Sequence, residues 1–177
     1  VKPRLFVSLF VGALLFALST VAGACGGGDG GGELTLEQYF QRLEAVASDY
    51  EQRGDALFEN FGEEFDSEEE QVQATQEFWK EFLVLLQEFV GDLDDVNPPS
   101  EAEAAHEESV DAGGEMLEAF QELVDQVTQA ESITELAEGF DDIELDAAGD
   151  RFEQACVELQ GIADDNGIDV DLNCGEE

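Results

Sequence analysis

Basic residues are scarce in this chain: six lysines and arginines stand against 45 aspartates and glutamates, a formal charge of −39 at pH 7. Nucleic-acid binding requires Lys and Arg to neutralise phosphates, so this composition excludes DNA and RNA as partners. The same negative charge is repelled by an anionic bilayer. Acidic chains with few apolar residues are disordered, but 43% of this chain is hydrophobic and its apolar residues recur periodically. We therefore expect the acidity to form the solvated surface of a folded core.

Histidine is almost absent, and this limits the chemistry that the chain can perform. His106 is the single histidine, and one histidine on one helix does not indicate a Ser/His/Asp triad. Glu103 and His106 have the Glu-x-x-His spacing of di-iron helical bundles, but such sites need a second histidine and further inward glutamates. No carboxylate falls on an apolar face, where burial would raise its pKa for acid catalysis. The sequence therefore predicts a non-enzymatic protein with no catalytic residue, metal site or cofactor.

Two weaker candidates for a site have simpler explanations. His106 falls within an apolar helical stripe, which favours a packing histidine over a pH switch or a ligand contact. Asp169, Asp171 and Asn173 begin like a calcium loop, but Cys174 stands where such a loop needs glycine. This excludes an EF-hand and leaves weak cation binding open.

The first 25 residues have the order of a secretory signal. Lys2 and Arg4 are followed by an apolar run over residues 5–18 and by small residues up to Cys25. Here the chain resembles a bacterial lipoprotein precursor, with Val21-Ala22-Gly23-Ala24-Cys25 as the lipobox. The resemblance implies a diacylglyceryl thioether on Cys25, cleavage before Cys25, and a lipid anchor on the extracytoplasmic face of the bacterial cell membrane.

Two other interpretations of this segment remain open. Ala22-Gly23-Ala24 also satisfies the small-x-small rule of the ordinary signal peptidase, which would cut the same bond without adding lipid. Residues 5–24 carry no charge and are long enough for an uncleaved membrane helix. On the lipoprotein interpretation, residues 1–24 are the signal, residues 25–33 are a lipidated cysteine with a glycine-rich tether, and residues 34–177 form one domain.

The chain from Cys25 onward is more acidic than the whole. Lys2 and Arg4 leave with the signal, so four basic residues face 45 acidic ones, a formal charge of −41. Those four are Arg42, Arg53, Lys80 and Arg151. One explanation of such a charge is solubility, above all at high salt concentration. The other is attraction of cations or of a basic partner.

Lipidation of Cys25 would leave two cysteines, an even pair in a compartment where disulfides persist. We therefore predict a Cys156–Cys174 disulfide. A reactive or metal-binding thiol pair is the alternative, which the absence of Cys-x-x-Cys spacing and of a nearby histidine disfavours.

Four occurrences of a Ser/Thr-x-x-Glu/Gln pattern lie at even intervals of 32, 33 and 32 residues along the chain. In this pattern a hydroxyl and a carboxylate or amide satisfy N–H groups at the start of a helix. The four pairs are Thr35 and Gln38, Ser67 and Glu70, Ser100 and Glu103, and Ser132 and Glu135. Each heads an apolar stripe of helical period. The spacing predicts an all-α fold, an up-and-down antiparallel four-helix bundle.

The last quarter of the chain departs from this regularity. The sequence predicts a short helix from Ile133 to about Phe140, which Gly139 and two aspartates interrupt. A second amphipathic stretch follows and ends at Asn166-Gly167, a natural helix end. Residues 168–172 alternate apolar and polar, as an extended tail would. We expect a broken last helix followed by a tail that the disulfide pins.

The aromatic residues fall on the predicted core stripes. Phe78, Trp79 and Phe82 could line a ligand pocket, but aromatic residues at helical spacing usually form core. The sequence thus predicts a membrane-anchored extracytoplasmic lipoprotein acting as a non-enzymatic binding or envelope-interaction module. Its partner would be an envelope protein or a cation. The alternative is a helical carrier of cations or small ligands.

Overall fold

The computed structural model describes residues 34–61, 65–141, 146–172 and 174. Contacts between Cα atoms divide the chain into Val1–Gly31 and Gly32–Glu177, and all described residues belong to the second unit. The predicted signal, Cys25 and the tether lie outside the described residues. Every helix in the described part of the chain is too short or too polar to span a membrane.

The described residues form five α-helices and contain no β-strand, so the predicted all-α class is confirmed. The helices are α1 (Leu36–Asn60), α2 (Glu68–Asp94), α3 (Glu103–Val127), α4 (Ile133–Asp141) and α5 (Asp146–Asp165). The predicted break in the last quarter of the chain is the division between α4 and α5.

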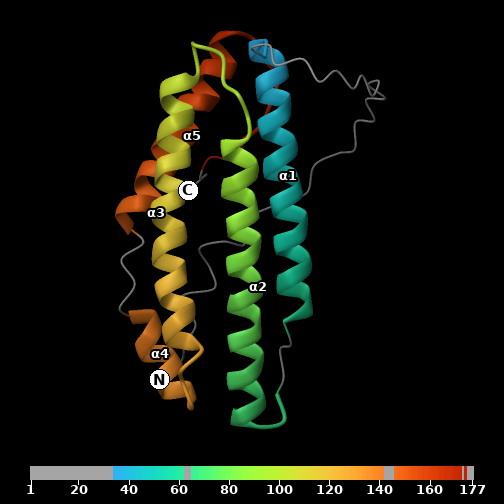
Figure 1. Ribbon diagram of the computed structural model, residues 1–177. Helices are drawn as coiled ribbons and strands as arrows, with labels where there is room; N and C mark the ends of the chain where they lie inside the picture. Colours follow the sequence, from blue (N-terminus) through green and yellow to red (C-terminus); the bar gives the residue numbers. More distant parts are fainter. Residues whose placement is uncertain (1–33, 62–64, 142–145, 173, 175–177) are drawn as a thin grey trace. The chain divides into compact units, whose positions relative to one another are not determined.

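The helices pack in a ring of neighbours (Figure 1). Helix α1 contacts α2 and α5, and α3 also contacts α2 and α5. In the figure, α1 and α3 run downward while α2 and α5 run upward, so neighbours in the ring are antiparallel. The short α4 packs against α2 and α3, and makes no contact with α1.

Three of the four predicted caps start helices. Thr35 and Gln38 form a complete capping box: the Thr35 N–H donates to Gln38 Oε1 at 3.1 Å, and the Gln38 N–H donates to Thr35 Oγ1 at 3.3 Å. At Ser67 and Ser132 the hydroxyl also accepts the third helical N–H. There the glutamate carboxylate accepts the N–H one residue before the cap instead (Glu70 from Asp66, 2.8 Å; Glu135 from Glu131, 2.7 Å).

The predicted cap at Ser100 is wrong. Helix α3 begins at Glu103 after Ala102, which offers no side-chain cap, and the Ser100 hydroxyl donates to the Glu101 carboxylate. The cause lies in the preceding prolines, which have fixed φ and no N–H. The Ala102 N–H donates to the Pro99 carbonyl at 2.9 Å, closing a turn over residues 99–102. Because Ser100 lies within this turn, helix α3 begins two residues later than predicted.

Two clusters of buried side chains lie at opposite ends of the helices. The tail cluster joins α1, the end of α2, the start of α3, α5 and the C-terminal tail: Tyr39, Phe40, Leu43, Val46, Leu93, Val96, Ala102, Ala105, Leu159, Ala163 and Leu172. The α4 cluster joins α2, α3 and α4: Val72, Leu123, Val127, Ala130 and Leu136. Burial of these apolar side chains holds the helices together.

The C-terminal tail leaves α5 through a glycine turn. Gly167 has φ +68°, a left-handed conformation that glycine adopts without steric cost. The Ile168 N–H donates to the Ala163 carbonyl, and the Gly167 N–H donates to that of Asp164. These two bonds define a Schellman motif, which confirms the predicted helix end.

After this turn the tail runs back along α5, as predicted. The Gln160 side-chain amide makes two hydrogen bonds to the tail backbone. Its Nε2 donates to the Val170 carbonyl, and its Oε1 accepts the Leu172 N–H, each at 3.0 Å. The predicted Cys156–Cys174 disulfide is present, with the two Cα atoms 5.4 Å apart. The tail is thus held by packing, by one glutamine and by a covalent bond.

Candidate functional site

The one histidine of the chain is part of a buried hydrogen-bonded pair. Tyr39 of α1 is 0% exposed and His106 of α3 is 4% exposed. Tyr39 Oη lies 3.1 Å from His106 Nδ1, and the two rings meet edge to face at 5.7 Å. Tyr39 has no other hydrogen-bond partner among the described residues, which assigns its O–H as the donor and the imidazole proton to Nε2.

Both members of this pair are held neutral. Burial raises the pKa of the Tyr39 hydroxyl, since the phenolate would lose its solvation. Burial likewise lowers the pKa of His106, while the carboxylates of Asp94 and Glu107 act in the opposite direction. The geometry is that of a satisfied core histidine. Glu103 is exposed while His106 is buried, so the Glu-x-x-His spacing does not bring the two side chains to one site.

Two arginines tie helices together with surface ion pairs. Arg151 of α5 donates to Glu108 at 2.6 Å and to Glu115 at 2.5 Å, both on α3. Arg151 also lowers the pKa of Glu108 by its hydrogen bond and charge. Arg53 of α1 pairs with Asp49 one turn earlier and with Glu88 of α2. Such exposed pairs position helices and contribute little to stability.

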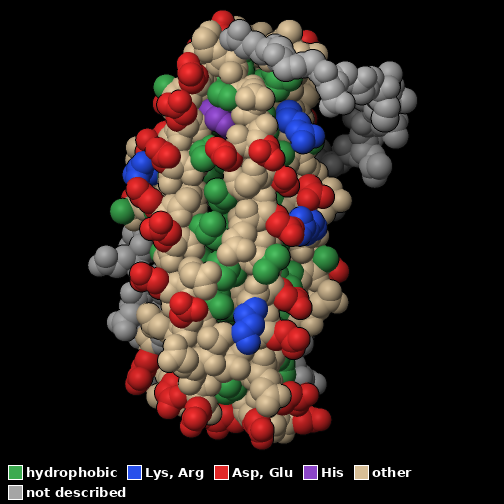
Figure 2. Space-filling model, viewed as in Figure 1, with side chains coloured by type: hydrophobic (Ala, Val, Ile, Leu, Met, Phe, Trp, Pro, Cys, Tyr) green, Lys and Arg blue, Asp and Glu red, His purple; other side chains and the backbone are tan. Residues whose placement is uncertain are grey.

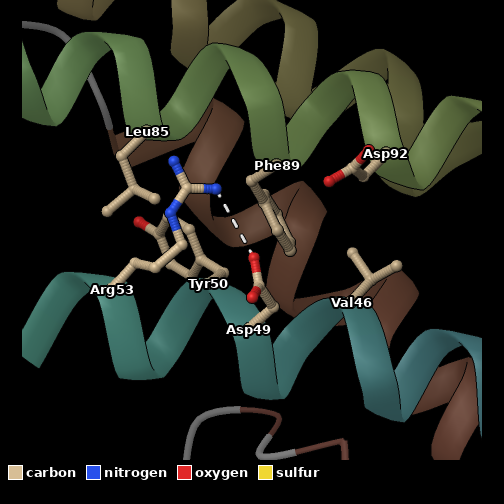
Figure 3. A pocket seen from close by; sticks show the side chains of 7 residues that line it. All are labelled: Val46, Asp49, Tyr50, Arg53, Leu85, Phe89 and Asp92. Carbon is tan, nitrogen blue, oxygen red and sulfur yellow. Dashed lines mark hydrogen bonds and ion pairs between the residues drawn. The ribbon is translucent and has the colours of Figure 1, made fainter.

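A shallow hollow lies between α1 and α2 beside Arg53 (Figure 3). It is lined by Val46, Asp49, Tyr50, Arg53, Leu85, Phe89 and Asp92. The Tyr50 and Phe89 rings lie against each other at 4.5 Å, and the hollow has no space that would hold a water molecule. Its one cation already pairs with carboxylates, so the hollow offers no site for a small ligand.

Aromatic side chains gather where α1 ends and α2 begins. This aromatic cluster joins α1, the connection after it, α2 and α3 through ring contacts of 4.9–6.5 Å: Phe58, Phe61, Phe65, Phe78, Trp79, Phe82 and Phe120. Phe78 is buried, but Phe58 is 52% exposed. The predicted core role of Phe78 is therefore confirmed, while Trp79 and Phe82 are only half-buried.

Acidic side chains are spread over the face of the molecule that Figure 2 shows. Figure 2 shows hydrophobic side chains in a strip on one face, with aspartates and glutamates on both sides and at the end where α2 begins. Sequence periodicity placed Phe58 on the core stripe of α1. The structure exposes half of Phe58, which the stripe alone could not reveal because exposure depends on the neighbouring helices.

Ligands for a metal ion do not converge within the described part of the chain, where no three His, Cys, Asp or Glu side chains are grouped to hold one. Cys156 and Cys174 are joined to each other. Asp169 and Asp171 are exposed, and Asn173 and Cys25 lie outside the described residues.

No protein-family model, curated protein or solved structure matches this chain. Its function is therefore inferred from the residues above.

Proposed function

We propose that this protein is a lipid-anchored extracytoplasmic binding module. In this proposal the signal is cleaved before Cys25, the lipid on Cys25 enters the outer face of the cell membrane, and the glycine-rich tether carries residues 34–177. These residues form an up-and-down four-helix bundle in which α4 and α5 share the place of the fourth helix. The ring of antiparallel neighbours supports this description of the fold.

The Cys156–Cys174 disulfide is the observation that carries the proposed location. Disulfides persist outside the cytoplasm and are rare within it. The pairing uses two of the three cysteines and leaves Cys25 for lipidation. The sequence of the first 25 residues and the pairing of the other two cysteines thus support the same location independently.

Binding, rather than catalysis, is the role that the described surface supports. Tyr39 and His106 are buried and hydrogen-bonded to each other, and Arg53 and Arg151 are paired with carboxylates. What the surface does offer is an aromatic cluster with a half-exposed phenylalanine among acidic side chains. Apolar anchors framed by polar residues are typical of protein interfaces.

The test is the intact mass of the protein expressed with its own signal in a bacterial host, before and after reduction. We expect loss of residues 1–24, gain of a diacylglyceryl group, and a gain of the mass of two hydrogen atoms on reduction. Cys25→Ser should abolish lipidation and release the protein from the membrane fraction, whereas Cys156→Ser/Cys174→Ser should leave the anchor intact. A cleaved product without lipid, or an uncleaved chain, would contradict the proposed anchor.

A further inference from the structure

We propose that the protein docks a cationic, amphipathic polypeptide segment of another protein at the exposed edge of the aromatic cluster. The docking site consists of Phe58, Phe61 and Phe82 with the acidic side chains around them. The inference deepens the proposed binding function and rests on it for its biological setting, but not on the lipid anchor.

Phe58 is suited to be the apolar anchor of such a site. Its ring contacts Phe78 at 5.1 Å and Phe82 at 6.5 Å, so one side of the ring is fixed by the core while half of the side chain faces solvent. Phe82 in turn contacts Phe120 of α3 at 5.3 Å, which ties the surface to a third helix. A rigid aromatic side chain that is already ordered loses little conformational entropy when a partner covers it.

The packing of the helices explains why this edge is open. Helix α1 contacts α2 and α5, but α5 contributes to the tail cluster at the other end of α1. The short α4 contacts α2 and α3 and does not reach α1. The end of α1 that carries Phe58 therefore has α2 as its one helical neighbour among the described elements.

The charges around Phe58 decide which partner fits. Residues 54–82 contain ten acidic residues and one basic residue, Lys80. The acidic side chains of this range in described positions are all exposed: Asp55, Glu59, Asp66, Glu68, Glu69, Glu70, Glu77 and Glu81. Arg53, just before this range, is paired with Asp49 and Glu88.

Electrostatic complementarity therefore selects a cationic segment. A second copy of this chain would bring another set of carboxylates against the first, and like charges facing each other oppose association. An anionic lipid surface or a nucleic acid is repelled for the same reason. A segment with Leu or Phe on one face would cover the Phe58 ring, and flanking Lys or Arg side chains would meet the carboxylates.

The experiment titrates the purified, host-processed protein with an 18-residue peptide of lysine and leucine at helical spacing. Two readouts are used, isothermal titration calorimetry and emission of Trp79, the one tryptophan of the chain, which contacts Phe78, Phe82 and Phe120. We expect binding with a change in Trp79 emission. Phe58→Ser should weaken it about tenfold, as expected for loss of an interface anchor.

Val157→Ser is the matched control. Val157 on α5 is 53% exposed and also has acidic neighbours, but it lies away from the aromatic cluster. Its substitution should change the affinity less than twofold. Asp55→Asn/Glu59→Gln tests the charges without touching the core, and should weaken binding and reduce its salt dependence.

Equal affinities for wild type, Phe58→Ser and Val157→Ser would overturn the proposal, because they would show attraction by the whole acidic surface. Equal binding of a peptide with the same composition but no apolar face would also overturn it. Concentration-dependent self-association that Phe58→Ser abolishes would assign the surface to a second copy instead. Failure of Cys25 lipidation leaves each of these outcomes interpretable, so the two proposals fail separately.

Discussion

The hydrogen bond between Tyr39 and His106 joins α1 to α3 through one oxygen atom, and Tyr39→Phe removes only that atom. Because His106 Nδ1 then loses its donor inside the core, we expect the free energy of unfolding at pH 7.5 to fall by about 1–3 kcal/mol. Urea unfolding measures it. Tyr50→Phe is the control, since the Tyr50 hydroxyl has no hydrogen bond among the described residues, and it should stay within about 0.5 kcal/mol of wild type. Equal losses would refute the role of the bond.

His106 also makes stability depend on pH. Burial lowers its pKa in the fold below the ordinary value of 6.5, so the unfolded chain binds a proton there first as the pH falls. The stabilisation by neutral His106 is fully present above pH 6.5. It is lost as the pH falls from there through the lower folded pKa.

His106→Gln removes this titration and keeps an acceptor for the Tyr39 hydroxyl. We expect the stability advantage of wild type over His106→Gln to shrink between pH 7.5 and pH 5, by urea unfolding at each pH. The carboxylates that face the imidazole, Asp94 and Glu107, are present in both proteins, so their contributions to the difference largely cancel. A difference that is constant or grows with acid would contradict the prediction.

At the scale of the element, the end of α5 provides a pair of substitutions with opposite signs. Gly167→Ala places a Cβ on a residue with φ +68°, and we expect it to destabilise by about 1–2 kcal/mol. Gly161→Ala lies inside α5 with nothing within 4 Å of the new Cβ, and it should stabilise by about 0.5–1 kcal/mol. Thermal unfolding of both variants checks the signs. A Gly167→Ala variant that is as stable as wild type would show that the turn does not depend on a left-handed residue, and a destabilised Gly161→Ala variant would contradict the expected gain.

The end of α3 depends on one side chain of α2. Gln76 Nε2 lies 3.1 Å from the Val127 carbonyl, 3.4 Å from that of Thr128 and 2.9 Å from that of Ala130. Gln76→Glu replaces this donor by an acceptor of the same shape, so we expect a loss of about 1–3 kcal/mol. Gln73→Glu adds the same charge at an exposed position of α2 and should change stability by less than about 0.5 kcal/mol. Similar losses in both would indicate a general charge effect.

Helix starts show how far local sequence determines an element. Thr35 and Gln38 are three residues apart and satisfy each other, so their capping box follows from spacing alone. Ser100 has the same spacing to Glu103, but Pro98 and Pro99 impose a turn that the motif does not contain. The bonds made by Gln76 and Gln160 join residues distant in the chain or in separate elements. No periodic pattern of apolar residues encodes such bonds.

At the scale of the whole molecule, the number of cysteines predicted the Cys156–Cys174 disulfide. With Cys25 assigned to the lipid, each of the other two cysteines has the other as its one possible partner. The openness around Phe58 was not predictable in the same way. An apolar stripe on α1 shows which side chains face the interior, but whether a neighbour covers them depends on where α4 and α5 lie. The candidate docking surface therefore became visible only in the fold, although its acidic residues stand in the sequence.

The charge of the whole molecule leads to the last prediction. Carboxylates repel one another across the folded domain, and dissolved salt screens this repulsion. The Debye length, beyond which charges hardly interact, falls from about 30 Å at 0.01 M salt to about 3 Å at 1 M. We therefore expect the midpoint of thermal unfolding to rise with NaCl by at least about 2–4 °C, the shift that 1 kcal/mol produces in a domain of this size. Choline chloride at equal ionic strength should have the same effect, because screening depends on charge and not on the identity of the cation.

Calcium and magnesium chloride separate this screening from the alternative role as a cation carrier. A bound cation stabilises the fold in proportion to the logarithm of its concentration above its dissociation constant. Stabilisation by either ion at micromolar concentration, where it adds almost nothing to ionic strength, would favour a carrier with a specific site. Divalent ions that follow the ionic-strength curve of NaCl and choline chloride would leave the carboxylates as a screened, solvated surface. In that case the acidic residues around Phe58 remain unoccupied by metal and are free to meet a cationic partner.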